Sequence, residues 1–383
     1  MEGGAYYYGK AGLNHVVSVG TDNKKATAKT LGDTVAVNLS DTAHYVNIAE
    51  VNAAKSGNRL DLTAGATGST LRGGTYQTTL RGGVGTDLLV GGSGADTFWF
   101  EEGVDSSDTV TSYASKNDKT FLANQAIAIR EGDAADVTIK GAGNDVQFVT
   151  DSGNTLTLQK AVGATNAINV LSVDGDEQTT LSYYVGATKS KSKNNFVATL
   201  GTDTDTVTGG ALKSYYIGST TDATITDTLS VKMAAVKKGE VPKAVNATFS
   251  LQSANLMGID VLDTSAISYK GVASKVTLQG ATSGSYTLKG EAKGYTTDHF
   301  DLVDLEQGSN AVTISNININ EVIELGVGVK VTGTYNKKKN ICTYTLTDAT
   351  DKSLGTLTVT GVKGLLQQST DGETNHVKLT RTL

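Results

Sequence analysis

The sequence contains almost no cysteine or proline, and it has no long run of apolar residues. Cys342 is the single cysteine, which excludes an intrachain disulfide framework. Pro242 is the single proline, so the turns must be built mainly from other residues. The longest apolar runs fall far short of the roughly 18 residues that a membrane-spanning helix requires, and we therefore predict no membrane insertion.

Basic charge is also scarce. The 383 residues include 33 Lys and Arg against 39 Asp and Glu, which gives a net charge of −6. Binding to nucleic-acid phosphates requires a basic patch, so we predict no nucleic-acid partner. Two lysine groups, within 189–193 and 337–339, lie in polar surroundings and are expected to be solvated loops rather than binding patches.

Catalytic motifs are missing as well. Neither a His-Glu-x-x-His motif nor a Gly-x-Ser-x-Gly motif occurs, and the four histidines, His15, His44, His299 and His376, are scattered along the chain. Aspartate pairs at 174/176 and 203/205 do not complete the twelve-residue EF-hand loop and are expected to be ordinary turns. We predict that the chain is not an enzyme.

Glycine, threonine, valine and tyrosine are abundant. The chain has 44 Gly and 15 Tyr, with 38% apolar and 19% charged residues. Thr, Val and Tyr favour strands, whereas Gly, Asn and Asp favour the turns between them. This composition predicts an all-β protein with a polar surface, long enough for two or three domains.

Two glycine-rich nonapeptides follow each other without a gap, GGVGTDLLV at 82–90 and GGSGADTFW at 91–99. Three further nonapeptides, counted backwards to residue 55, keep the apolar residue at the eighth place but not the aspartate at the sixth. The eighth residues of the five copies are Leu62, Leu71, Leu80, Leu89 and Phe98. Closely spaced glycines allow positive φ angles, so main-chain carbonyls and an Asp carboxylate can converge on one cation. Oxygen ligands of this kind suit Ca²⁺.

The pattern resembles the nonapeptide repeat of RTX (hemolysin-type calcium-binding) proteins, which include secreted bacterial surface proteins. The resemblance implies a short parallel β-roll in which two nonapeptides make one coil, so that turns 18 residues apart stack. It implies that calcium is held near the far end of the roll. The implied ligand residues are Gly82, Gly83, Gly85, Asp87, Gly91, Gly92, Gly94, Asp96, Asp105 and Asp108.

At a spacing of 18 residues, Asp87 and Asp105 stack in successive coils on the same edge of the roll, and they are the one complete pair of aspartates that this spacing gives. Asp96 has no aspartate in the coil below it, although Asp108 in the following loop can contribute from above. The alternative is that these glycines only form turns in a β-solenoid that binds no metal. The turns near residues 64 and 73 must already be metal-free in this way, because their nonapeptides lack the aspartate.

The sequence also repeats on a larger scale, because 35–74 reads closely against 247–290. We predict a first module at 1–185, a polar connecting segment at 186–213 and a homologous second module at 214–383. Each module is expected to be a short parallel β-roll, or β-solenoid, capped by an antiparallel β section with alternating apolar residues. In the first module, the strands of this section are predicted at 108–113, 118–122, 136–140, 144–149 and 155–158. The ligand-bearing nonapeptides have no counterpart before Phe300, so the second module is expected to be a degenerate, calcium-free copy.

Three functional classes remain open. The leading prediction is a secreted, calcium-stabilised structural protein that self-assembles in an extracellular layer, fibre or matrix. The alternatives are an adhesin or carbohydrate-binding module that takes a surface glycan, and the non-catalytic calcium-binding part of a longer secreted hydrolase. The first ten residues lack the regions of a signal peptide. Two explanations of the missing signal peptide stay open. RTX-like proteins are typically exported through an uncleaved C-terminal signal, or the sequence is a fragment of a longer protein.

Overall fold

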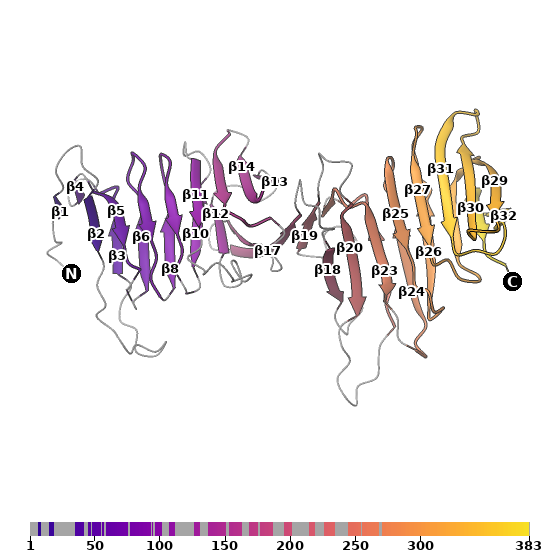
Figure 1. The fold of residues 1–383 in the computed structure, drawn as a ribbon, viewed down its shortest axis with the longest axis horizontal. Helices are drawn as coiled ribbons and strands as arrows, with labels where there is room; N and C mark the ends of the chain where they lie inside the picture. Colours follow the sequence, from indigo (N-terminus) through magenta and orange to yellow (C-terminus); the bar gives the residue numbers. More distant parts are fainter. Residues whose placement is uncertain are drawn as a thin grey trace. The chain divides into compact units, whose positions relative to one another are not determined.

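The fold was taken from a computed structural model of the chain. The structure describes residues 7–8, 15–18, 35–41, 45–46, 48–101 without 55, 57, 58, 76, 93 and 95, 107–111, 126–130, 137–150, 153–162, 168–174, 177–186, 195–200, 214–218, 226–233, 244–267 without 254, and 270–382. These residues form two compact units, unit 1 within 1–188 and unit 2 within 189–383. Each unit is described by itself (Figure 1).

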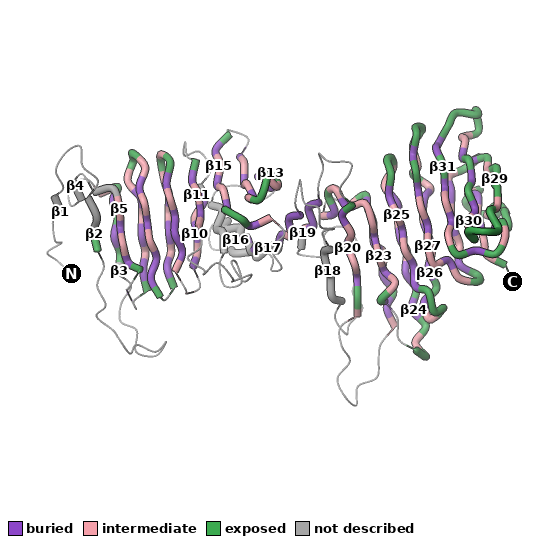
Figure 2. Tube along the Cα trace, viewed as in Figure 1, coloured by how far each residue is buried: buried purple, intermediate pink, exposed green. Residues whose placement is uncertain are grey.

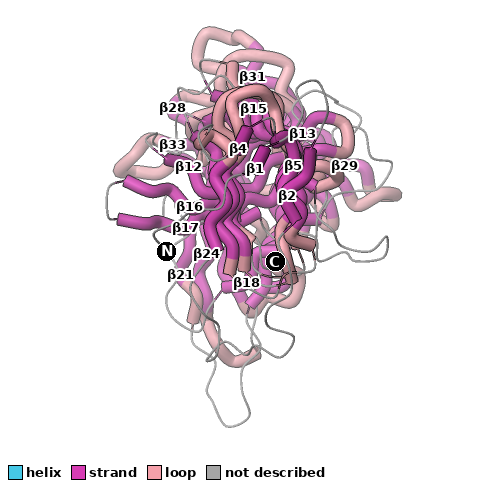
Figure 3. Tube along the Cα trace, turned by 90° about the vertical axis from the view of Figure 1, so that its left-hand side faces the viewer, coloured by secondary structure: helices cyan, strands magenta, loops and turns pink. Residues whose placement is uncertain are grey.

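The described residues contain strands, turns and loops but no helix, which confirms the all-β prediction (Figure 3). No described segment therefore forms a helix long and apolar enough to cross a membrane.

Unit 1 is a parallel two-sheet solenoid. Its strands are β1 Tyr7–Tyr8, β2 His15–Ser18, β3 Val35–Asn38, β4 Tyr45–Val46, β5 Ile48–Asn52, β6 Leu60–Thr63, β7 Thr70–Arg72, β8 Thr78–Arg81, β9 Leu88–Val90, β10 Thr97–Glu101, β11 Ser107–Thr111, β12 Ala126–Arg130, β13 Val137–Ala142, β14 Asp145–Thr150, β15 Thr155–Leu158, β16 Ile168–Asp174 and β17 Glu177–Val185. One sheet has the order β17-β16-β12-β10-β8-β6-β3, and the other has the order β13-β14-β15-β11-β9-β7-β5-β2. Because β6 to β11 alternate between the sheets, the chain winds around a shared core.

The eighth residues of the nonapeptides form the centre of that core. Leu80 lies in register with Leu62 below it and Phe98 above it. Leu71 and Leu89 pair in the same way in the other sheet. All five side chains are fully buried, as the purple positions of Figure 2 show for this part of the unit. The register confirms that two nonapeptides make one coil here, and each coil buries apolar surface against the next at about 25 cal/mol per Å².

Antiparallel strands close unit 1, as predicted. β13 pairs with β14 and β14 with β15, while β16 pairs with β17. The predicted strands at 136–140, 144–149 and 155–158 correspond to β13, β14 and β15. The strand predicted at 108–113 is β11, and the prediction that it is antiparallel was wrong, because β11 pairs in parallel with β9 and β15. The predicted strand at 118–122 lies outside the described residues.

Unit 2 has the same architecture with longer coils. Its strands are β18 Asn195–Leu200, β19 Ser214–Ile217, β20 Thr228–Met233, β21 Asn246–Ser250, β22 Leu256–Met257, β23 Val261–Ala266, β24 Ser274–Gln279, β25 Ser285–Lys289, β26 Thr296–Leu302, β27 Ala311–Ser315, β28 Val322–Val327, β29 Lys330–Asn336, β30 Ile341–Thr347, β31 Ser353–Thr360, β32 Gln367–Thr370 and β33 His376–Thr380. Its two large sheets have the orders β18-β20-β23-β25-β27-β31-β30-β29 and β21-β24-β26-β28-β33-β32. The pairs within β18 to β28 are parallel, whereas β29 to β33 form antiparallel caps.

Candidate functional site

Asp87 and Asp108 lie side by side at the start of β9 and β11. The parallel register pairs Thr109 with Leu88, which places the two aspartates one coil apart in the same column. The backbone N–H of Asp87 donates to Oδ1 of Asp108 at 3.0 Å. Below them, the N–H of Ser69 donates to Oδ1 of Asp87 at 2.5 Å. The three residues therefore form a column of amide-to-carboxylate hydrogen bonds.

The other carboxylate oxygen of Asp87 is left without a partner. Asp87 and Asp108 are each only 2% exposed, and Oδ2 of Asp87 is buried without a hydrogen bond in the described structure. Asp87 also lines a hollow of ≈ 440 Å³ together with Thr67 and Thr86 of the turns and Thr109 of β11. A buried polar atom without a partner is costly, so this oxygen marks a place where a proton or a cation can bind.

The two carboxylates have perturbed acidities. Burial raises the pKa of Asp87 to about 7, and the neighbouring charge of Asp108 adds to this effect. Burial also raises the pKa of Asp108 to about 6. Two buried carboxylates in contact repel each other when both are ionised, and a bound cation would remove that repulsion.

Glycines allow the turns to approach these carboxylates. A Cβ atom at Gly82 would collide with Oδ2 of Asp108. Gly83 and Gly85 have φ angles of 83° and 113°, in the left-handed region that other residues rarely adopt. A side chain at Gly85 would also press against the backbone of Gly68 in the coil below. These three predicted residues thus lie in the turn that leads into Asp87, packed between Gly68 of the coil below and Asp108 of the coil above.

Asp96 has a different environment. Its Oδ1 accepts the N–H of Thr78 at 3.0 Å, and its Oδ2 accepts the N–H of Gly92 at 2.7 Å. Both oxygens are therefore engaged by main-chain donors, and a cation would have to displace them. A Cβ atom at Gly92 would collide with the carbonyl oxygen of Gly74, so this turn packs on the one below it. Gly91 and Gly94 belong to the same turn.

The expected partner of Asp87 was wrong. Asp105 lies outside the described residues, and the residue in register with Asp87 is Asp108, 21 positions later rather than 18. The reason is that the chain from β9 to β11 is three residues longer than two nonapeptides. The nonapeptide spacing therefore no longer gives the register at this coil.

The same hydrogen bond recurs throughout both units. In each case the backbone N–H of a residue donates to the side chain that lies in register one coil later. The donor and acceptor pairs are Ser69 and Asp87, Thr78 and Asp96, Asp87 and Asp108, Asp227 and Asp260, Val245 and Ser274, Gly284 and Asn310, and Asp298 and Glu321. The sequence interpretation missed the pairs in unit 2, because they lie outside any nonapeptide. The signal that could have predicted them is a polar residue at or near the start of a strand with alternating apolar residues.

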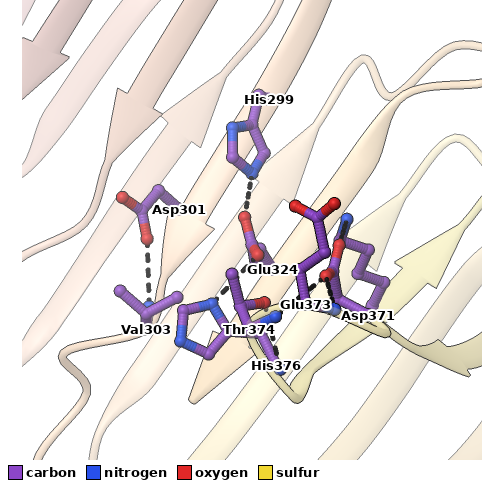
Figure 4. A network of polar contacts seen from close by, with 9 residues as sticks. His299, Asp301, Val303, Glu324, Asp371, Glu373, Thr374 and His376 are labelled. Carbon is purple, nitrogen blue, oxygen red and sulfur yellow. Dashed lines mark hydrogen bonds and ion pairs between the residues drawn. The ribbon is translucent and has the colours of Figure 1, made fainter. Parts of the chain in front are cut away.

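A second polar network joins three strands of unit 2 (Figure 4). Glu324 on β28 contacts Nε2 of His299 on β26 at 2.8 Å and Nδ1 of His376 on β33 at 3.0 Å. Next to it, Lys378 forms an ion pair with Asp371. The two histidines are far apart in the sequence, and the pairing of β28 with β26 and β33 brings them to one carboxylate.

Within the part of the chain that the structure describes, no group of three or more His, Cys, Asp or Glu side chains is arranged to hold a metal ion. A cation at Asp87 and Asp108 would need main-chain or hydroxyl oxygens to complete its coordination. The unpartnered oxygen, the adjoining hollow and the oxygen-only donors fit a hard cation such as Ca²⁺. Asp96 does not fit, because its oxygens already have donors.

Comparisons with known proteins give little further guidance. No family model matches the chain, and no curated protein matches it. Among solved structures, the chain is similar to the extracellular lipase LipA from Serratia marcescens, with 10% identity and a TM-score of 0.16. The match covers 86% of this chain and 40% of the lipase chain. A similarity this weak carries no argument about function.

Proposed function

We propose that the chain is a secreted structural protein whose β-rolls are stabilised by calcium and self-assemble in an extracellular layer, fibre or matrix. The observation that supports it most is the stacked Asp87 and Asp108 pair, with a buried, unpartnered oxygen next to a hollow. This pair lies in the Gly-Gly-x-Gly-x-Asp stretch that resembles RTX repeats.

Calcium would act on this site through electrostatics and linkage. It would supply positive charge between the two carboxylates, while the residues of this chain position them through the Ser69 and Asp87 amides. Because the column exists only when the coils are stacked, the ion binds the folded chain in preference to the unfolded one. The stabilisation is then about 2.7 kcal/mol at a hundredfold excess of free calcium over Kd.

Open sheet edges support the assembly part of the proposal. β29 and β32 end the two large sheets of unit 2 in the described structure, and all four residues of β32 are exposed. An edge strand presents main-chain donors and acceptors that can pair with another copy of the chain. Contacts of the head-to-tail kind propagate into filaments or lattices when they do not close into a ring.

Electron microscopy and light scattering of the purified chain test the proposal directly. In CaCl₂ we expect ordered assemblies and a scattering signal that grows with protein concentration, and in EGTA we expect both to be reduced. A strictly monomeric species at high protein concentration with calcium present would contradict the structural function.

A further inference from the structure

Asp298, Glu321 and Glu291 form a buried acidic group in unit 2. Asp298 lies on β26 and Glu321 directly precedes β28, and the register of His299 with Val322 places these two acids in one column. Glu291 lies in the loop between β25 and β26, and its N–H donates to Oδ2 of Asp298 at 2.6 Å. Each of the three acids is 1% exposed. Three carboxyl groups are therefore enclosed close to one another.

Two of these acids have hydrogen-bond donors on both carboxylate oxygens. Oε1 of Glu321 accepts the N–H of Asp298 and the side-chain amide of Asn318, each at 3.2 Å, and Oε2 accepts the N–H of Asn318 at 2.5 Å. The two oxygens of Glu291 accept main-chain N–H groups of the turn 293–295, at 2.7 and 2.8 Å. Hydrogen bonds donated to a carboxylate favour its ionised form. The donors therefore favour negative charge on Glu321 and Glu291.

Asp298 differs from the other two acids, because one of its oxygens has no donor. Oδ2 accepts the N–H of Glu291, whereas Oδ1 is buried without a hydrogen bond in the described structure. A cation at Oδ1 would find no second carboxylate oxygen to bind, since those of Glu321 and Glu291 already have donors. A proton needs only one oxygen, and a neutral carboxyl group costs far less to bury than a charged one. This group thus fits a proton and not a metal ion.

The charged groups that face Asp298 from the surrounding elements are acidic. They are Glu321 at the start of β28 and Glu291 in the loop before β26, whereas Lys275 on β24 and Lys293 in the loop are exposed. Among the described residues, no Lys, Arg or His side chain forms an ion pair with any of the three acids. Ionisation of Asp298 would therefore add a further negative charge to a buried group that has no counter-ion, which is strongly unfavourable.

The acidities agree with this arrangement. Burial, followed by the negative charges of Glu321 and Glu291, raises the pKa of Asp298 to about 7. Burial also raises the pKa of Glu321 to about 7, while the hydrogen bonds from Asn318 and Asp298 act to lower it. Asp298 and Glu321 titrate as a coupled pair, so the donors decide which of them is protonated. The proton belongs on the acid that has a bare oxygen, which is Asp298.

We propose that Oδ1 of Asp298 is a proton-binding site, so that unit 2 takes up a proton when it folds. The unfolded chain releases this proton near pH 3.8, whereas the folded chain holds it up to about pH 7. The contribution of the proton to stability is therefore full below about pH 4 and is lost as the pH rises to about 7. The site makes unit 2 sensitive to pH without calcium, and the inference thus goes beyond the proposed function.

Urea unfolding of the full chain in EGTA, at several pH values from 5 to 9, counts this proton. D298N has a neutral side chain of the same shape. The ratio of its folding equilibrium constant to that of the wild type should rise about tenfold for each pH unit between pH 5 and pH 7, and level off above pH 8, because only the wild type loses the proton on unfolding. The titration of Asp87 and Asp108 is common to both proteins and cancels.

Two further variants make the test specific. D298S also cannot ionise, and its ratio to the wild type should rise with the same slope whatever its absolute stability, which guards against a destabilised D298N. D351N is the matched control, because Asp351 in unit 2 has a side chain that is 75% exposed. It removes one negative charge outside the buried group, and its ratio to the wild type should not change with pH.

A ratio that stays constant between pH 5 and pH 7 for D298N and D298S would overturn the inference. An equal rise for D351N would also overturn it, because the slope would then report general charge repulsion instead of a proton on Asp298. The experiment contains no calcium, so its result is independent of the proposed function.

Discussion

At the scale of single residues, the carboxylates at the coil starts act first as acceptors for main-chain amides. A hydrogen bond to a charged acceptor contributes about 1.5 to 3 kcal/mol, and it satisfies an N–H at the point where a parallel ladder begins. Asp96 shows the purely structural case, with both oxygens bonded. Asp87 shows the other case, with one oxygen left over for a ligand.

Replacing Asp96 by Ala should therefore destabilise the chain whether or not calcium is present. The change leaves the amides of Thr78 and Gly92 without their carboxylate acceptor, and we expect a loss of roughly 2 to 4 kcal/mol in the free energy of unfolding. Urea unfolding in CaCl₂ and in EGTA measures it. A loss that appears only in CaCl₂ would show that Asp96 is a ligand instead.

The raised pKa values of Asp87 and Asp108 predict a pH dependence of the metal-free chain. The folded state holds these protons up to about pH 7 and 6, whereas the unfolded state releases them near 3.8. The contribution of the pair to stability is therefore full below about pH 4 and is lost as the pH rises to about 7.

The difference in melting temperature between the wild type and D87N isolates this effect from other ionisable groups. In EGTA, D87N should gain stability relative to the wild type as the pH rises from 4 to 7, because its amide cannot ionise. A difference that is constant over this range would contradict the raised pKa of Asp87.

At the scale of the elements, the nonapeptide spacing predicts the core and the turn positions of β6 to β10. It fails where a coil departs from 18 residues, which is why Asp105 was expected where Asp108 lies. The antiparallel caps could be predicted from alternation alone, since each hairpin is local. The contact of His299 and His376 with Glu324 could not, because it depends on pairing between β28 and β33, which are far apart in sequence.

Leu80 tests the stacked core. It is fully buried between Leu62 and Phe98, so Leu80→Ala should cost about 2 to 5 kcal/mol through lost contacts and the cavity it leaves. Thr79→Ala, at the half-exposed neighbouring position, is the control and should cost far less. Urea unfolding compares the two, and equal losses would argue against a core built from the eighth residues.

The open edge of β32 tests the route of assembly. Lysine on an edge strand disfavours pairing with another chain, so the Gln367→Lys/Ser369→Lys variant should self-associate at higher protein concentration than the wild type. Gly372→Lys/Thr374→Lys, in the adjoining exposed turn, adds the same charge of +2 and is the control. Sedimentation velocity gives the association constants. Equal weakening by both variants would indicate a general effect of charge instead of edge pairing.

At the scale of the whole molecule, two units of the same architecture differ in coil length and in sequence motif. The boundary between the units at 188 lies close to the predicted end of the first module at 185. The segment 186–213, predicted to be a connector, contains β18, which pairs with β20 in unit 2. The repeat in the sequence predicts two modules, but not the shared amide-to-carboxylate columns, because those depend on side chains brought together only by the register of the coils. Calcium dependence stays a proposal, and it rests on the Asp87 and Asp108 column of unit 1.

The central claim is that calcium stabilises the folded chain through Asp87 and Asp108. The most direct test is the difference in unfolding free energy between the wild type and D87N, measured by urea titration at pH 7.5 with increasing CaCl₂. Any contribution from unit 2 is common to both proteins and cancels. We predict that this difference grows by about 2.7 kcal/mol between EGTA and a hundredfold excess of calcium over Kd. A difference that does not change with calcium would contradict the claim.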